Sequence, residues 1–174
     1  YDPADPTSRE AFIELTNASD TPVDLSGWRF SAGVDYTFPP GTSINAQGYV
    51  VVGENPATLS SRYGTTALGP WEGRLKKRGE TITLRDAAGA VVNRVDYGVG
   101  FPWPTGSNGG GGSAELIHPN LDNDLGGSWR VAGTVTEPAE AVTYVEAGAS
   151  GWRYRKGTSE PPSNWRSTTF SEDA

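Results

Sequence analysis

The sequence predicts an all-β sandwich, and three observations carry this prediction. Glycine and proline, at 23 and 13 of the 174 residues, supply turns for many short strands and work against long helices. Short β-branched and aromatic runs recur between these turn residues, as a sandwich requires. The 6 Trp, 7 Tyr and 5 Phe indicate that large aromatic side chains make up much of the core.

The first half of the chain contains the clearest strand patterns. Residues 11–16 place Ile13 and Leu15 on one face and predict a strand. A turn then leads to Trp28, which we expect to be the main anchor of the core. The apolar run 48–53 is bounded by glycines, and it predicts a central strand that is buried on both faces.

One short helix and one hairpin follow. Asn55 can cap the helix, Pro56 suits its first position, and Gly64 can close it in the left-handed conformation. Residues 81–85 and 91–97 are joined by a turn with glycine and predict a β-hairpin. Residues 113–118 form the last convincing strand before Trp129.

The order and spacing of several motifs resemble the lamin tail domain as it occurs in secreted bacterial proteins. The most specific are IELTN at 13–17, VDLSGW at 23–28 and GETITLRDAAG at 79–89. This resemblance covers about residues 1–132 and implies an immunoglobulin-like β-sandwich with no enzymatic activity of its own. It also implies an attachment module of a larger extracellular or cell-surface protein, which positions a neighbouring catalytic or adhesive module.

The composition changes after this region. Residues 133–141 lack aromatic side chains and are interpreted as a linker. Residues 142–174 are interpreted as a β extension, or as the truncated start of a second β module. Through Trp152, Tyr154 and Trp165 they resemble the opening of a galactose-binding-like jelly roll. Free sandwich edges and this extension allow strand exchange between chains, while the oligomeric state stays open.

Charge and cysteine content exclude several classes of function. The net charge of −7 and the pI near 4.7 argue against general binding of nucleic acid or anionic membrane. No cysteine is present, so thiol chemistry and cysteine-ligated zinc are excluded. No apolar run reaches the roughly 20 residues of a membrane span.

The sequence predicts no enzyme and no catalytic residue. His118 is the only histidine and ends a strand before Pro119, as a surface residue does. Glu14 and Glu115 both lie within predicted strands and could meet as an acid–base pair, an alternative that the sequence leaves open.

One loop contains oxygen ligands suited to calcium. Asp122, Asn123 and Asp124 are Ca²⁺ candidates, although a closing Glu at EF-hand spacing does not follow. An ordinary Asp/Asn-rich turn is the alternative. We otherwise expect no cofactor.

Aromatic residues in connections are the candidates for ligand contact. Trp71, Phe101 and Trp103 lie in Gly/Pro-rich segments, where their rings could stack on sugars or dock on a protein. A protein or a cell-surface polysaccharide is therefore the expected partner, and a carbohydrate-binding module is the alternative function. The rings could instead plug the open ends of the sandwich.

A dense basic cluster lies before the predicted hairpin. It consists of Arg74, Lys76, Lys77 and Arg78, with no aromatic residue between them. We interpret it as a solvated tip, and contact with an acidic polymer is the alternative.

Overall fold

The structure, a computed structural model, describes residues 7–132, which belong to a unit spanning Tyr1–Thr134. The predicted linker 133–141 and extension 142–174 lie outside the described residues. In chain order the elements are β1 (Phe12–Thr16), β2 (Val23–Asp24), β3 (Arg29–Ala32), β4 (Val34–Thr37), β5 (Ser43–Ile44), β6 (Tyr49–Gly53), α1 (Pro56–Tyr63), β7 (Ala67–Leu68), β8 (Glu72–Gly73), β9 (Glu80–Arg85), β10 (Val91–Tyr97), the 3₁₀ helix η1 (Thr105–Ser107), β11 (Ala114–Leu116), the 3₁₀ helix η2 (Gly126–Ser128) and β12 (Trp129–Val131).

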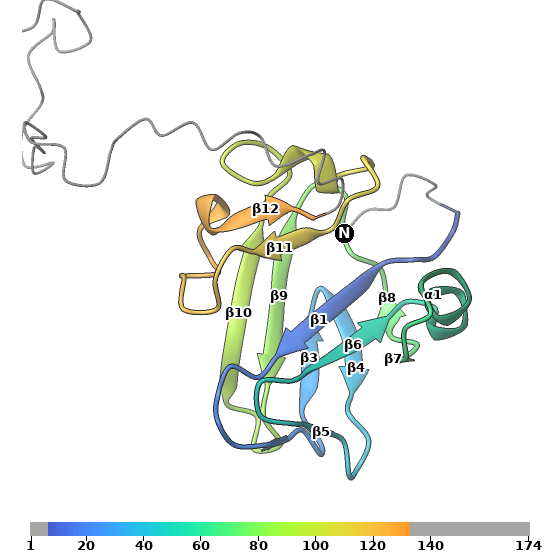
Figure 1. Cartoon of the computed structure of the whole chain (residues 1–174), viewed down its shortest axis with the longest axis vertical. Helices are drawn as coiled ribbons and strands as arrows, with labels where there is room; N and C mark the ends of the chain where they lie inside the picture. The colour runs from blue at the N-terminus through green and yellow to red at the C-terminus, as the bar shows by residue number, and fades with distance from the viewer. Residues whose placement is uncertain (1–6, 133–174) are drawn as a thin grey trace, which may run out of the picture. The chain divides into compact units, whose positions relative to one another are not determined.

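Two main sheets confirm the predicted all-β fold. The larger sheet has the order β10-β9-β3-β4-β8, and the smaller has the order β1-β6-β7. Figure 1 shows the strands of the smaller sheet crossing in front of the larger one, with α1 beside β6 and β7. Because β6 pairs with β1 on one side and β7 on the other, its predicted central position is confirmed. Two short ribbons, β2–β5 and β11–β12, complete the described fold.

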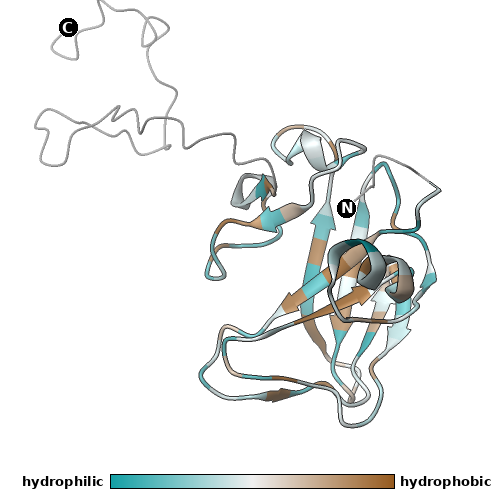
Figure 2. Ribbon diagram, turned by 45° about the vertical axis from the view of Figure 1, so that its right-hand side comes forward, coloured by the Kyte–Doolittle hydropathy of each residue, from teal (hydrophilic) through white to brown (hydrophobic). Residues whose placement is uncertain are grey.

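The core is aromatic, but its anchor differs from the prediction. Phe38 and Phe30 are 0% and 1% exposed, and their ring centroids lie 5.9 Å apart. Trp28, expected as the main anchor, is only partly buried and packs against this core. It lies in the turn before β3, where its amide bonds the Leu25 carbonyl, so that Phe30 takes the inward position. Along the strands in Figure 2, hydrophobic and hydrophilic segments alternate, as expected for strands with one buried face.

Local signals placed the helix and the hairpin correctly. The Asn55 side chain accepts a hydrogen bond from the Thr58 amide at 3.2 Å, and Gly64 closes α1 with φ 66°. The hairpin β9–β10 forms over 80–97 with a bulge after Val91. The strand predicted over 113–118 is shorter and forms β11 only.

Asn17 joins the end of β1 to the loops around β2 and β5. Its side chain is buried, and Nδ2 donates to the carbonyl oxygens of Thr21, Asn45 and Ile44 at 2.8, 3.0 and 3.3 Å. Its Oδ1 accepts from the amide and hydroxyl of Ser19 at 3.0 and 2.7 Å. One side chain thus contacts three backbone acceptors, of which the Asn45 carbonyl also accepts from the Gly48 amide at 3.0 Å.

The VDLSGW motif forms a turn that is closed by side chains. Asp24 Oδ1 accepts from the Ser26 hydroxyl at 2.6 Å and from the Ser26 amide at 2.8 Å. These two bonds, the hydroxyl first, lower the pKa of the Asp24 carboxyl. The Ser26 hydroxyl oxygen also accepts from the Gly41 amide at 2.8 Å, which ties this turn to the loop before β5.

Candidate binding surfaces

Phe101 is presented to solvent on the loop that follows β10. Its side chain is 95% exposed, the highest value among the large hydrophobic residues of the described range. Single exposed apolar residues are common on soluble proteins, but an almost fully exposed phenylalanine ring is not a usual surface choice. Of the three predicted contact aromatics, Phe101 alone has its ring open to a ligand.

Trp103 packs at the base of the loop that carries Phe101. It is half-buried, and its ring centroid lies 6.0 Å from that of Trp129 at an interplanar angle of 33°. A Cβ added at Gly126 would lie 2.9 Å from the Trp103 backbone nitrogen, and one at Gly98 would lie 2.9 Å from its Cδ1. Trp129 is fixed in turn, because its Nε1 donates to the Asn123 carbonyl at 2.9 Å. The tilted ring pair therefore holds the base of the Phe101 loop in place.

Trp71 does not fit the predicted contact role. It is 4% exposed and belongs to the hydrophobic core, which it enters just before β8. Its Nε1 is buried, with no hydrogen-bond partner in the described part of the chain. Trp71 therefore follows the alternative interpretation, in which an aromatic residue of a Pro-rich connection fills the interior.

The calcium candidates make hydrogen bonds that attach their loop to the edge of the larger sheet. Asp124 Oδ1 accepts from the Asp96 amide of β10 at 2.6 Å, and Asn123 Nδ2 donates to the Asn93 side chain at 2.9 Å. Asp122 Oδ1 accepts from the Asp124 amide at 3.0 Å, as in an Asx turn. Across residues 7–132, no three acidic or histidine side chains gather in a way that could hold a metal ion. These hydrogen bonds form an Asx turn and cover a strand edge.

Of the two carboxylates considered as an acid–base pair, Glu14 has a raised pKa. Partial burial raises the pKa of Glu14, and the negative charge of Glu115 raises it further. Glu115 also forms a salt bridge with Arg130 at 3.4 Å across the β11–β12 ribbon. His118 is exposed beyond β11, where its Nδ1 accepts from the Asn120 amide at 3.2 Å.

The raised pKa of Glu14 predicts a measurable pH dependence. A carboxyl whose pKa is higher in the folded state favours folding when protonated, and this contribution is lost as pH rises through that pKa. Glu14→Gln is therefore expected to match the unchanged protein at acid pH and to exceed its stability at pH 7. Since the Glu14 side chain remains largely accessible to solvent, which screens its charge, the gain in unfolding free energy should be about 0.5 kcal/mol or less. Urea unfolding at several pH values measures it, and an equal effect at acid and neutral pH would contradict the interaction.

Two buried glutamates pair with three arginines at one end of the sandwich. Neither glutamate was identified from the sequence. Glu10 and Glu54 are 3% and 7% exposed. Glu54 Oε1 lies 3.0 Å from Arg9 Nε and 3.4 Å from Arg74 Nε, while Glu10 Oε1 pairs with Arg62. These partners are far apart in the chain. The position of Glu54, directly after the buried run of β6, was the one available signal.

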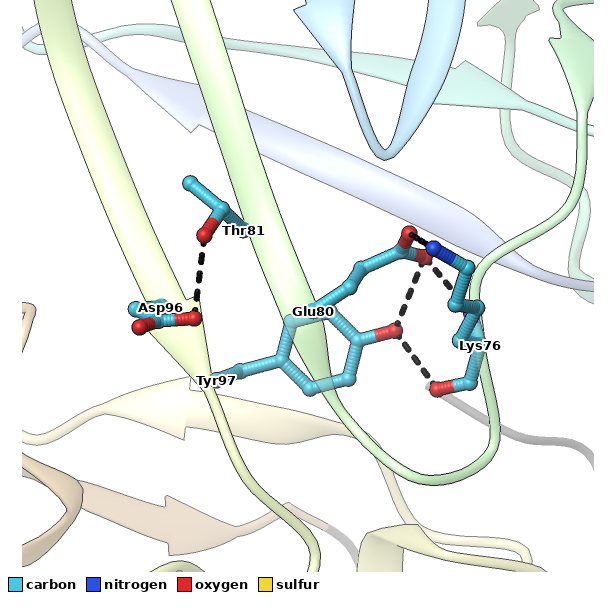
Figure 3. Close-up of polar contacts among 5 residues, drawn as sticks. All are labelled: Lys76, Glu80, Thr81, Asp96 and Tyr97. Carbon is cyan, nitrogen blue, oxygen red and sulfur yellow. Dashed lines mark hydrogen bonds and ion pairs between the residues drawn. The ribbon is translucent and has the colours of Figure 1, made fainter.

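The predicted basic cluster divides into two parts in the structure. Lys76 is fixed by contacts with Glu80. Its Nζ lies 3.3 Å from Glu80 Oε2, and its amide donates to Glu80 Oε1 at 2.6 Å. Figure 3 shows the ring of Tyr97 reaching from β10 to this turn, where its hydroxyl donates to the Lys76 carbonyl at 2.8 Å. Lys77 and Arg78 follow on the exposed part of the same turn.

The fold and its sites define an immunoglobulin-like β-sandwich module that carries an exposed aromatic loop and a basic end. The family model of the Lamin Tail Domain matches residues 1–99, more than half of the chain, and the chain belongs to this family of non-enzymatic domains. The match ends shortly after β10, so the Phe101 loop and the β11–β12 ribbon follow the matched range. A search of the curated proteins found no match. Within residues 7–132, no helix is both long and apolar enough to span a membrane.

Proposed function

We propose that this chain is a non-catalytic attachment module of a larger secreted bacterial protein. It holds a neighbouring catalytic or adhesive module near the cell surface, through contacts made by the Phe101 loop. The family membership supports the non-catalytic role, since lamin tail domains are non-enzymatic sandwiches. The exposure of Phe101 is the observation that carries the proposal.

An exposed aromatic ring on a supported loop is suited to binding. Each square ångström of apolar surface removed from water contributes roughly 25 cal/mol, so that covering a phenylalanine ring yields a substantial part of a binding free energy. Aromatic residues often dominate interface energies. Because the contact between the tilted rings of Trp103 and Trp129 already fixes the base of the loop, less conformational entropy is lost on binding.

Phe101→Ser tests the proposal directly. In co-sedimentation of the purified chain with isolated bacterial cell envelopes, this variant should lower the apparent affinity roughly tenfold or more. Its free energy of unfolding should change by about 0.5 kcal/mol or less, because a 95% exposed ring contributes little to the core.

Tyr49→Ser is the matched control. Tyr49 is also an exposed aromatic residue, at 66%, but it lies at the start of β6. Its replacement should leave envelope binding unchanged. Equal losses for both variants, or no envelope binding by the unchanged chain, would refute attachment through the Phe101 loop.

A carbohydrate-binding module is the second candidate, favoured by the same open ring. A glycan array distinguishes the two functions. Soluble glycans that bind the chain, and that are lost with Phe101→Ser but not with Tyr49→Ser, would favour sugar recognition. Envelope binding without any glycan hit would favour a protein receptor.

A further inference from the structure

Three arginines pair with the two buried glutamates, and Lys77 and Arg78 follow one of them, Arg74, in the same loop. We propose that these five cations form a binding surface for an acidic polysaccharide. We call Arg9, Arg62, Arg74, Lys77 and Arg78 the arginine rim. Its members come from three segments: the residues just before β1, the end of α1, and the loop between β8 and β9. Glu54, directly after β6, and Glu10, just before β1, are the carboxylates that pair with its arginines. The proposal does not depend on the Phe101 loop.

Glu54 positions two arginines side by side. Arg9 and Arg74 each approach the same oxygen, Glu54 Oε1, through Nε. Their side chains are 54% and 68% exposed, whereas that of Glu54 is 7% exposed. Both of these contacts with Glu54 are made at Nε, so among the described residues the Nη edge of each guanidinium can meet a second anion. This edge matches the geometry of carboxylate and sulfate oxygens.

The backbone of Arg9 is strained in a way that serves this geometry. Arg9 has φ 53°, in the left-handed region that residues with a side chain rarely adopt. Such outliers persist where the surrounding structure over-determines them, and they concentrate at functional sites. Here the Glu54 amide bonds the Ala11 carbonyl at 2.9 Å, which fixes the chain just after Arg9. The strained residue directs its guanidinium onto Glu54.

Arg62 is positioned by the second buried glutamate. Glu10 accepts from Arg62 Nη1 and, at 3.0 Å, from the Tyr63 hydroxyl. The Arg62 guanidinium also lies 5.7 Å from the centroid of the Tyr63 ring. The Arg62 side chain remains 59% exposed. Both glutamates thus act from the interior and leave their arginines at the surface.

The loop that carries Lys77 and Arg78 is fixed by the network of Figure 3. Glu80 binds the amide and the Nζ of Lys76, and the Tyr97 hydroxyl binds the Lys76 carbonyl. Gly79 then turns the chain with φ 91°, and a Cβ there would lie 2.4 Å from the Tyr97 carbonyl oxygen. Lys77 and Arg78 lie between these two fixed residues, Lys76 and Gly79, so the loop needs little ordering on binding.

The chemistry of the rim favours an acidic polysaccharide. Several exposed cations on a chain of net charge −7 form a local exception that attracts anions. Single-stranded nucleic acid is usually bound with aromatic platforms for its bases, and the Tyr63 ring already contacts Arg62. The net negative charge also opposes the dense charge of duplex nucleic acid more than the sparser charge of a polysaccharide.

Binding of two defined polyanions tests the proposal. Heparin carries sulfate and carboxylate groups, polygalacturonate carries carboxylates only, and a short single-stranded DNA is the nucleic-acid arm. The chain should bind at least one polysaccharide more tightly than the DNA, with an affinity that falls as salt rises. Arg9→Gln with Arg74→Gln should weaken this binding about tenfold or more.

Arg29→Gln with Arg94→Gln is the matched control, since it removes the same charge from exposed arginines of β3 and β10. It should change the dissociation constant less than about twofold. Because removing Arg9 and Arg74 leaves a buried carboxylate without these partners, Lys77→Gln with Arg78→Gln supplies a second rim variant on exposed side chains. Circular dichroism confirms that each variant is folded.

Glu54→Gln separates positioning from charge. This substitution makes the rim more positive, so simple electrostatic attraction predicts tighter binding. Positioning predicts weaker binding instead, because both arginines lose their anchor. Tighter binding by Glu54→Gln would overturn the proposal. So would equal losses in rim and control variants, tighter binding to DNA, or no binding to either polysaccharide.

Discussion

Replacing Trp71 by alanine is expected to lower the free energy of unfolding by about 4 kcal/mol. The side chain is 4% exposed within the core, so its removal leaves a large cavity as well as losing buried apolar surface. Trp71→Phe should cost less. It removes the buried Nε1, which has no hydrogen-bond partner in the described part of the chain, and retains an aromatic ring. Chemical denaturation measures both variants.

The same experiment decides between the two roles considered for Trp71. Tyr49→Ala serves as the control, because an aromatic side chain that is 66% exposed should cost about 0.5 kcal/mol or less. If Trp71→Ala kept full stability but lost binding of a ligand, Trp71 would be a contact residue. That result would contradict its place in the core.

Asn17→Asp is expected to destabilise the fold by about 4 kcal/mol at pH 7. The change replaces the Nδ2 group, which donates to three backbone carbonyls, with an acceptor of nearly the same shape. Oxygen would then face oxygen at a buried position. The introduced carboxyl has a raised pKa in the folded state, so protonation restores one donor and the penalty should shrink as pH falls.

Asn45→Asp isolates this effect from charge. Asn45 is exposed and lies in the adjacent loop, so its substitution adds the same charge without removing a buried donor. We expect a change of about 0.5 kcal/mol or less. Similar losses of unfolding free energy for the two variants in urea unfolding would show that the buried hydrogen bonds of Asn17 do not stabilise the fold.

Features that depend on neighbouring residues could be predicted from the sequence. Asn55 and Gly64 bound a helix through their own hydrogen bond and dihedral angle, and both predictions are confirmed. The alternation within β1 predicted a strand for the same reason, since its two faces see different surroundings. The glycine and proline neighbours of Phe101 left its exposure open, because Trp71 has a similar context and is buried.

Features set by distant contacts could not be predicted. Trp71 has a loop-like context, yet it is buried because segments far along the chain close around it. The position of Glu54 after a buried strand was a signal for its burial, but its partners Arg9 and Arg74 are set by segments that are distant in the chain. The Asp122–Asp124 segment contains calcium-like oxygens, but their use depends on β10 lying beside the loop.

Hydrogen–deuterium exchange of the chain bound to cell envelopes tests the attachment account most directly. The account predicts slower exchange at the amides around Phe101 on binding, and the loss of this protection in Phe101→Ser. Exchange around Tyr49 at the start of β6 should not change. Protection that leaves the Phe101 loop unaffected, or that persists in Phe101→Ser, would contradict attachment through this loop.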